Sequence, residues 1–184
     1  MDKKLAENAV RGLLESFGEN PQREELKKTP ERVSRLFQNL LSGNEKSIKD
    51  ILKVTNNIRH DEMVVIRDVP FYSLCEHHLM PFFGKCHMAY IPENNRVVGI
   101  SRLAELVDAL SKKLQLQEKL TAEIANSIMK HLKPKGAGVV IEARHLCMEM
   151  LGPKHPETRI VTSAVRGIFR NDPKTREEFL AHVK

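Results

Sequence analysis

The residues of this chain that could do chemistry gather in two short segments. One holds Cys75, His77 and His78 in the run Ser-Leu-Cys-Glu-His-His, and the other holds His145 and Cys147 in the run His-Leu-Cys. The C-x-x-H spacing of the first segment lets one turn direct a thiol and an imidazole at a single ion. In the second segment the two residues are two apart, so on a strand their side chains would share a face. Two thiolates and an imidazole are a ligand set typical of zinc, and three protein ligands leave a fourth position open.

Two interpretations of such a zinc stay open. In a catalytic site, His77 and His145 are left beside the metal for proton transfer near neutral pH, and zinc activates water, so the chemistry would be hydrolysis. In a structural site, one of these two histidines is the fourth ligand. Cys86 lies inside an apolar stretch with only His87 beside it, on the opposite face, and is predicted to be a small buried hydrophobe.

The elements that must position these residues are helices in the N-terminal part of the chain and a mixture of strands and helices after it. Helical spacing of apolar residues predicts helices over 2–17, from Thr29 to about Ser42, and over 47–53, with Thr29 as N-cap and Pro30 at the first helical position. Two strands are then expected, over 63–71 and 85–91, followed by extended chain over 97–100. A helix capped by Ser101 and a helix from Gln117 to Leu132 come next. Strands over 138–143 and 159–169 and a helix from Pro173 complete the chain. This order predicts an α+β fold with antiparallel pairing.

Composition limits the class of protein. At 184 residues with 41% apolar content, the chain is expected to be one domain over 1–184, with an N-terminal helical region over 1–55 and a core over 60–184. No apolar run is long enough to cross a bilayer, and three cysteines form no disulfide framework, so we expect a soluble cytoplasmic protein without a membrane partner. The net charge of +6 is spread among acids and there is no Trp, which favours an anionic small molecule over a nucleic acid.

A second polar segment, Gln-Leu-Gln-Glu, ends at Gln117 and Glu118. A carboxylate here could accept two parallel hydrogen bonds from the N–H edge of a guanine ring. The same carboxylate in the first turn of a helix is favoured by the helix dipole alone. Both interpretations of Glu118 stay open on these residues.

Together these motifs resemble the GTP cyclohydrolase I family. The resemblance runs from about Thr29 to Leu180, and its motifs are Ser-Leu-Cys-Glu-His-His at 73–78, Tyr-Ile-Pro at 90–92, Gly-Ile-Ser at 99–101, Gln-Leu-Gln-Glu-Lys-Leu-Thr at 115–121, Glu-Ala-Arg-His-Leu-Cys-Met at 142–148 and Thr-Ser-Ala at 162–164. It implies the tunnelling fold, a toroidal homodecamer with active sites between subunits, and a zinc-dependent reaction. That reaction opens the imidazole ring of GTP at C8, releases formate and forms 7,8-dihydroneopterin triphosphate for pterin and folate synthesis.

The resemblance also implies a role for each site residue. Cys75, His78 and Cys147 would bind zinc. His145 would act as acid–base residue at the purine imidazole ring, and His77 would assist the later ring opening near the ribose.

The remaining residues implied by the resemblance would bind the purine nucleotide. Gln117 and Glu118 would hold the pyrimidine edge of guanine. Ser101 would lie in the substrate pocket, and Arg102 and Arg32 would contact the phosphates.

The chain departs from the family pattern where the triphosphate is held. The family carries arginines at the positions of Glu105 and Leu151, so two cationic contacts are missing and one is reversed in sign. Glu105 is also one helical turn from Arg102 and could pair with it. Candidates for replacing these contacts are Lys154, His155, Arg159 and Arg166. Two alternatives follow: a cyclohydrolase for a guanine or other purine compound with fewer phosphates, and a purine- or pterin-binding homologue that uses zinc only structurally.

Overall fold

The computed structural model describes residues 1–54, 59–151 and 158–184, with the side chain of Leu151 left out. The chain divides into two compact units, Met1–Ser42 and Gly43–Lys184, which are described separately. The first unit ends at Ser42, earlier in the chain than residue 55, where the expected N-terminal helical region ends. Within the described ranges, no helix combines the length and apolar character needed to span a membrane.

Two helices form the N-terminal unit. Helix α1 (Lys3–Ser16) is capped by Asp2, whose carboxylate accepts the Leu5 N–H at 3.0 Å. Helix α2 (Thr29–Leu40) begins one residue earlier than predicted, with Lys28 rather than Thr29 as N-cap. The prediction was wrong because the preceding segment is already turned: the Thr29 N–H donates to Leu26 O at 2.8 Å, so the helical conformation starts before the proline.

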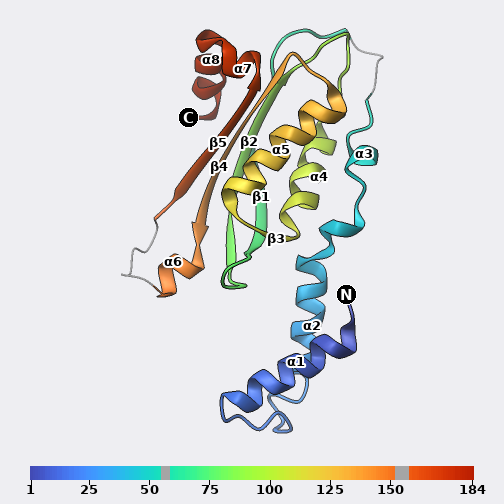
Figure 1. Cartoon of the computed structure of the whole chain (residues 1–184), viewed down its shortest axis with the longest axis vertical. Coiled ribbons are helices and arrows are strands. Elements are labelled where there is room, and N and C mark those ends of the chain that lie inside the picture. Colours follow the sequence, from blue (N-terminus) through green and yellow to red (C-terminus); the bar gives the residue numbers. More distant parts are fainter. Residues whose placement is uncertain (55–58, 152–157) are drawn as a thin grey trace. The chain divides into compact units, whose positions relative to one another are not determined.

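A five-stranded sheet forms the centre of the second unit (Figure 1). Its order is β3-β1-β2-β4-β5, with bounds Leu114–Gln115 for β3, Val64–Cys75 for β1, Pro81–Ile91 for β2, Gly136–His145 for β4 and Ile160–Gly167 for β5. The four long strands pair antiparallel, which confirms the predicted α+β class. The sequence did not predict β3, which pairs parallel to the last two residues of β1.

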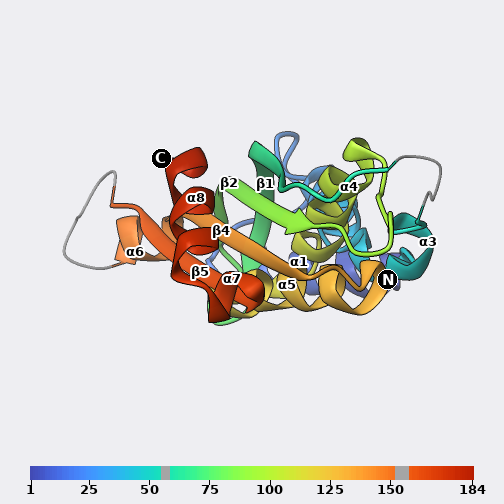
Figure 2. The same cartoon turned by 90° about the horizontal axis from the view of Figure 1, so that it is seen from above.

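Helices cover both faces of this sheet (Figures 1 and 2). Helices α4 (Ile100–Ser111) and α5 (Gln117–Leu132) pack on the face that carries Cys86, Met88 and Tyr90, which are at most 1% exposed. The alternate residue Ala89 points to the other face, where it packs with Phe169 of α7 (Ile168–Asn171) and Phe179 of α8 (Pro173–Val183). The predicted burial of Cys86 is confirmed, and burial raises the pKa of its thiol. The remaining short helices are η1 (Ser42–Glu45), α3 (Ile48–Ile51) and α6 (Leu146–Leu151).

The boundaries of α4 and β5 differ from the sequence prediction. Helix α4 starts at Ile100 with Gly99 as N-cap, so Ser101 is not the cap, and the Arg102 N–H already donates to Gly99 O at 2.9 Å. Strand β5 ends at Gly167 rather than at residue 169. Gly167 has φ +59°, and a Cβ there would lie 2.3 Å from Lys135 O, so the chain turns at this glycine into α7.

The end of β4 separates the two residues of the second ligand segment. Strand β4 ends at His145, whose partner Phe82 is the second residue of β2, and Cys147 lies in the first turn of α6. His145 and Cys147 therefore do not share a strand face, because the chain passes from β4 into α6 between them. Helix α6 begins directly after His145 and satisfies the following backbone groups internally.

Candidate active site

The turn between β1 and β2 places the first two zinc-type ligands. The Cys75 N–H donates to Met80 O at 2.9 Å and the Leu79 N–H donates to Cys75 O at 2.8 Å, which closes the turn around His78. Leu79 adopts φ +54°, a left-handed conformation that reverses the chain within this short loop. The turn therefore brings the Cys75 thiol within 3.9 Å of His78 Nδ1.

The third ligand arrives from α6. The sulfur atoms of Cys75 and Cys147 and a ring nitrogen of His78 all lie within 4.8 Å of one another. Zinc bonds of about 2.3 Å to sulfur and about 2.0 Å to nitrogen put tetrahedral donors about 3.5–3.8 Å apart, so these three atoms need only a small contraction to share one ion. Burial and the neighbouring Cys75 raise the pKa of the Cys147 thiol, and a bound cation would favour the thiolates that this pair must form. The donor chemistry and spacing fit zinc.

His145 lies beside this cluster, held on two sides. Its ring stacks on Phe82 with centroids 4.7 Å apart and planes 10° apart, and its Nε2 is 2.7 Å from Gln117 Oε1. Burial lowers the pKa of His145, and the negative charge of Glu118 partly offsets this effect. Sequence reasoning missed Phe82, because an aromatic residue near the start of a strand has the same pattern as an ordinary core residue.

His77 is exposed to solvent next to the metal ligands. Its ring centroid lies 6.2 Å from that of His78, with the planes 82° apart, so the two adjacent imidazoles point in different directions. This geometry leaves the His77 ring accessible to a bound molecule while His78 turns toward the thiols.

Gln117 and Glu118 are adjacent in the first turn of α5 but face different surroundings. Gln117 is 1% exposed and its side chain contacts protein groups of β4 and β5. Glu118 is exposed and borders an open cavity of about 460 Å³ between α5 and β5, together with Thr121 and Thr162. Only the carboxylate of this pair is therefore presented to a ligand.

Within one chain, the phosphate-binding candidates of α4 lie away from the zinc-type cluster. The Ser73 hydroxyl donates to Ser111 O at 2.6 Å, so the C-terminal end of α4 is the end near Cys75. Ser101 lies ten residues earlier on the same helix, about 15 Å along its axis. Arg102 is beside Ser101, and its Nη1 is 2.8 Å from Glu105 Oε2.

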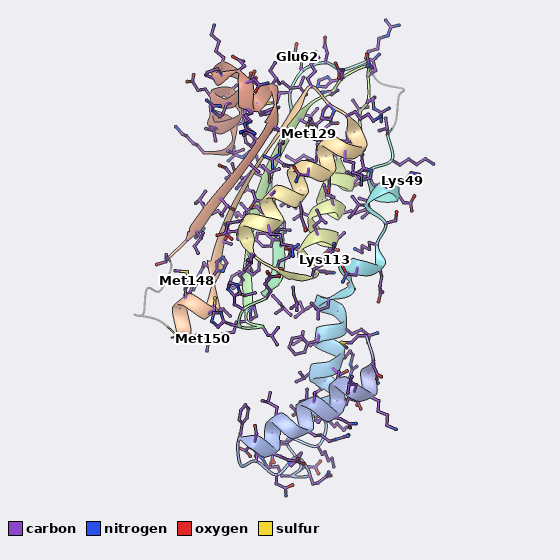
Figure 3. All side chains as sticks on the ribbon, viewed as in Figure 1. Lys49, Glu62, Lys113, Met129, Met148 and Met150 are labelled. Carbon is purple, nitrogen blue, oxygen red and sulfur yellow. The ribbon has the colours of Figure 1, made fainter. Side chains whose placement is uncertain are left out.

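The other phosphate-binding candidates are dispersed. Arg32 is exposed on α2 of the N-terminal unit. Arg159 pairs with Glu142, and the Arg166 Nε donates to Asn126 at 2.9 Å. Lys154 and His155 lie outside the described residues, and the side chain of Leu151 is not described. Figure 3 shows the α6 side chains Met148 and Met150 at the end of the sheet that carries the cluster, and Met150 is 67% exposed.

Comparison with known proteins identifies the family of the chain. A family model described as GTP cyclohydrolase I matches residues 6–184. The chain belongs to the GTP cyclohydrolase I family. It is 50% identical over 183 residues to a protein named GTP cyclohydrolase 1 from Caldanaerobacter subterraneus subsp. tengcongensis, covering 100% of this chain and 97% of the relative. Relatives with the same name are 48% identical in Clostridioides difficile and 46% identical in Bacillus subtilis, again over 100% of this chain and 97% of each relative. A crystal structure of the archaeosine synthase QueF-Like in the apo form aligns with a TM-score of 0.47 and 16% identity, covering 59% of this chain and 97% of that one.

Proposed function

We propose that this member of the family is a zinc-dependent GTP cyclohydrolase I. Water adds at C8 of GTP, C8 leaves as formate, and the remaining skeleton closes to 7,8-dihydroneopterin triphosphate, so that GTP and one water balance the two products. The observation that carries the proposal is the cluster of Cys75, His78 and Cys147 with His145 beside it and Glu118 on the adjacent helix turn. Such a product feeds pterin and folate synthesis.

The metal ligands and the flanking histidines would have different roles in the reaction. Zinc held by Cys75, His78 and Cys147 would supply Lewis-acid activation of water. His145 would transfer protons at the imidazole ring of the purine, and its lowered pKa keeps the neutral, proton-accepting form abundant at neutral pH. His77, exposed beside His78, would assist the later ring opening near the ribose.

The purine itself would be held by Glu118. Its carboxylate is exposed at the cavity between α5 and β5 and can accept two parallel hydrogen bonds from the N1–H and 2-amino groups of guanine. Adenine lacks this pair of donors on its corresponding edge. The carboxylate therefore provides a reason for guanine specificity beyond its favourable place at the helix N-terminus.

A second copy of the chain would complete the site. Because Ser101 and Arg102 lie about 15 Å along α4 from the end nearest Cys75, one chain does not bring the phosphate-binding candidates to its own zinc cluster. We therefore place the active sites between subunits of a homo-oligomer, a decamer by family resemblance, with Arg32 as a further phosphate contact. The three cysteines are free thiols in the structure, which fits a reducing cytoplasm.

One contact favours a second candidate function. Arg102 is engaged by Glu105 at 2.8 Å, so an acidic group lies beside the basic residue expected to bind phosphate. A guanine compound with one phosphate or none would avoid this repulsion while keeping the zinc and guanine contacts. Such an enzyme would catalyse the same ring opening on GMP or guanosine.

Turnover of three substrates tests both candidates. Zinc-loaded protein is incubated separately with GTP, GMP and guanosine, and formate and the fluorescence of the oxidised pterin are quantified. Turnover confined to GTP is the expected result. Formate from GMP or guanosine with little from GTP would assign the second candidate, and no formate from any of the three would reject both.

A further inference from the structure

The amide of Gln117 can adopt only one orientation. Its Nε2 lies 3.1 Å from Ile141 O of β4, 2.9 Å from Ile160 O of β5 and 3.0 Å from Thr162 Oγ1. Backbone carbonyls only accept hydrogen bonds, so the end of the amide that faces them must be the NH₂ group. With the amide reversed, its oxygen would face two carbonyl oxygens in a buried site, which is strongly unfavourable.

A chain of hydroxyl groups requires the same orientation. The Thr121 hydroxyl donates to Gln117 O at 2.7 Å, so its single hydrogen is used. The 2.7 Å contact between Thr121 Oγ1 and Thr162 Oγ1 must then use the hydrogen of Thr162. Thr162 Oγ1 has no hydrogen left and can only accept, so the Gln117 atom 3.0 Å from it must be the NH₂ group, whose two hydrogens are shared among the three acceptors. The contacts with the hydroxyl groups and the contacts with the carbonyl groups therefore each require the same orientation of the Gln117 amide.

This orientation decides which nitrogen of His145 carries a proton. The Gln117 Oε1 is the atom that faces His145 Nε2 at 2.7 Å, and an amide oxygen is only an acceptor. The imidazole must therefore donate from Nε2, which leaves the lone pair of the neutral ring on Nδ1. Stacking on Phe82 fixes the plane of the same ring, so Gln117 and Phe82 together define both its tautomer and its direction.

We propose that Gln117 is a positioning residue that holds His145 as the Nε2–H tautomer, so that His145 exchanges protons with the substrate through Nδ1. The side chain of Gln117 then contributes through His145 instead of through the pyrimidine edge of guanine, which is left to Glu118. This inference deepens the proposed function and rests on it for its kinetic part. The tautomer itself follows from the hydrogen-bond network alone.

The tautomer can be measured on the unaltered protein. The zinc-loaded full chain is labelled with ¹⁵N,¹³C-histidine and studied by solid-state NMR at a pH well above the ordinary pKa of histidine. The signals missing from the spectrum of His145→Asn identify His145, and correlation through Cδ2 identifies its Nε2. We expect a protonated, pyrrole-type Nε2 and an unprotonated, pyridine-type Nδ1; the reverse pattern would overturn the proposal.

Two matched variants separate positioning from substrate binding. Gln117→Met removes the amide at similar volume, and we expect kcat to fall about 100-fold while KM stays within about threefold, with both His145 tautomers now populated. Gln115→Met is the control: Gln115 is also 1% exposed and its Nε2 also donates to a backbone carbonyl, Leu110 O at 3.1 Å. We expect Gln115→Met to leave the His145 tautomer and kcat near the wild-type values.

The opposite kinetic result for Gln117→Met would reject the proposal. A raised KM with unchanged kcat and an unchanged His145 tautomer in Gln117→Met would mean that Gln117 binds the substrate, and the positioning role would be rejected. If the protein turns over no guanine compound, the proposed cyclohydrolase function fails. The NMR measurement on the unaltered chain still decides the tautomer in that case.

Discussion

Replacing Glu105 by Gln should tighten the binding of GTP and leave the fold intact. In the structure the Glu105 carboxylate lies 2.8 Å from the Arg102 guanidinium, and the two side chains are 45% and 51% exposed. An ion pair this exposed contributes at most about 1 kcal/mol to the free energy of unfolding. The substitution therefore costs little stability, while it removes one negative charge and releases Arg102 to contact phosphate.

The expected gain follows from Coulomb's law. A phosphate charge about 5 Å from the Glu105 carboxylate is repelled by about 0.8 kcal/mol in bulk water and by about 3 kcal/mol at an effective dielectric of about 20. Because the side chain is about half exposed, we expect the lower part of this range, about 1–2 kcal/mol. That corresponds to a roughly 5- to 30-fold lower dissociation constant for GTP. The gain should be smaller for GMP and absent for guanosine.

Calorimetric titration measures these constants without turnover if each protein also carries His145→Ala. The matched control is Asp108→Asn, which makes the same change of charge one turn further along α4, where Asp108 pairs with Lys46 and Lys112. The gain at Glu105 should shrink at high ionic strength, because salt screens exposed charges. Two results would show that the phosphates are not held beside Glu105. One is a dissociation constant for GTP that does not change relative to the control, and the other is an equal change in the dissociation constant for guanosine.

His145→Ala should abolish formate release from GTP while zinc, measured by atomic emission, stays bound; retained turnover would reject its acid–base role. Cys147→Ser should lower the zinc content per chain by at least about tenfold with an unchanged far-UV circular dichroism spectrum, and full zinc occupancy would exclude Cys147 as a ligand. Burial lowers the pKa of His87 from its ordinary 6.5, and Asp68 offsets this only in part. The unfolded chain therefore binds the proton at higher pH than the folded one, and stability falls as the pH drops below about 6.5. His87→Gln should lose less unfolding free energy than the parent between about pH 7 and about pH 5 in urea titrations, and equal losses would contradict this assignment.

Several features of this protein depend on residues that are neighbours in the chain. The C-x-x-H spacing is enough to bring Cys75 and His78 together, because the five residues between β1 and β2 form a tight turn that fixes both side chains locally. Helical periodicity likewise determines α4 and α5, and alternation determines the buried face of β2. The sequence therefore contained the class of the fold and the three zinc-type ligands, and it named His145 as the candidate acid–base residue.

Other features depend on pairing between distant segments. Cys147 reaches Cys75 only because β4 pairs with β2 and ends at His145, after which α6 turns the chain back toward the β1–β2 turn. The two-residue spacing of His145 and Cys147 would give a shared face only on a strand, and β4 ends between them.

The role of Gln117 shows the same limit most clearly. The family resemblance implied that Gln117 would hold guanine together with Glu118. The packing of α5 on the sheet instead buries its amide against Ile141 and Ile160 and aims its oxygen at His145. Adjacent residues on a helix point about 100° apart, so a motif fixes which side chains are present, whereas the surfaces packed around the helix decide what each one contacts.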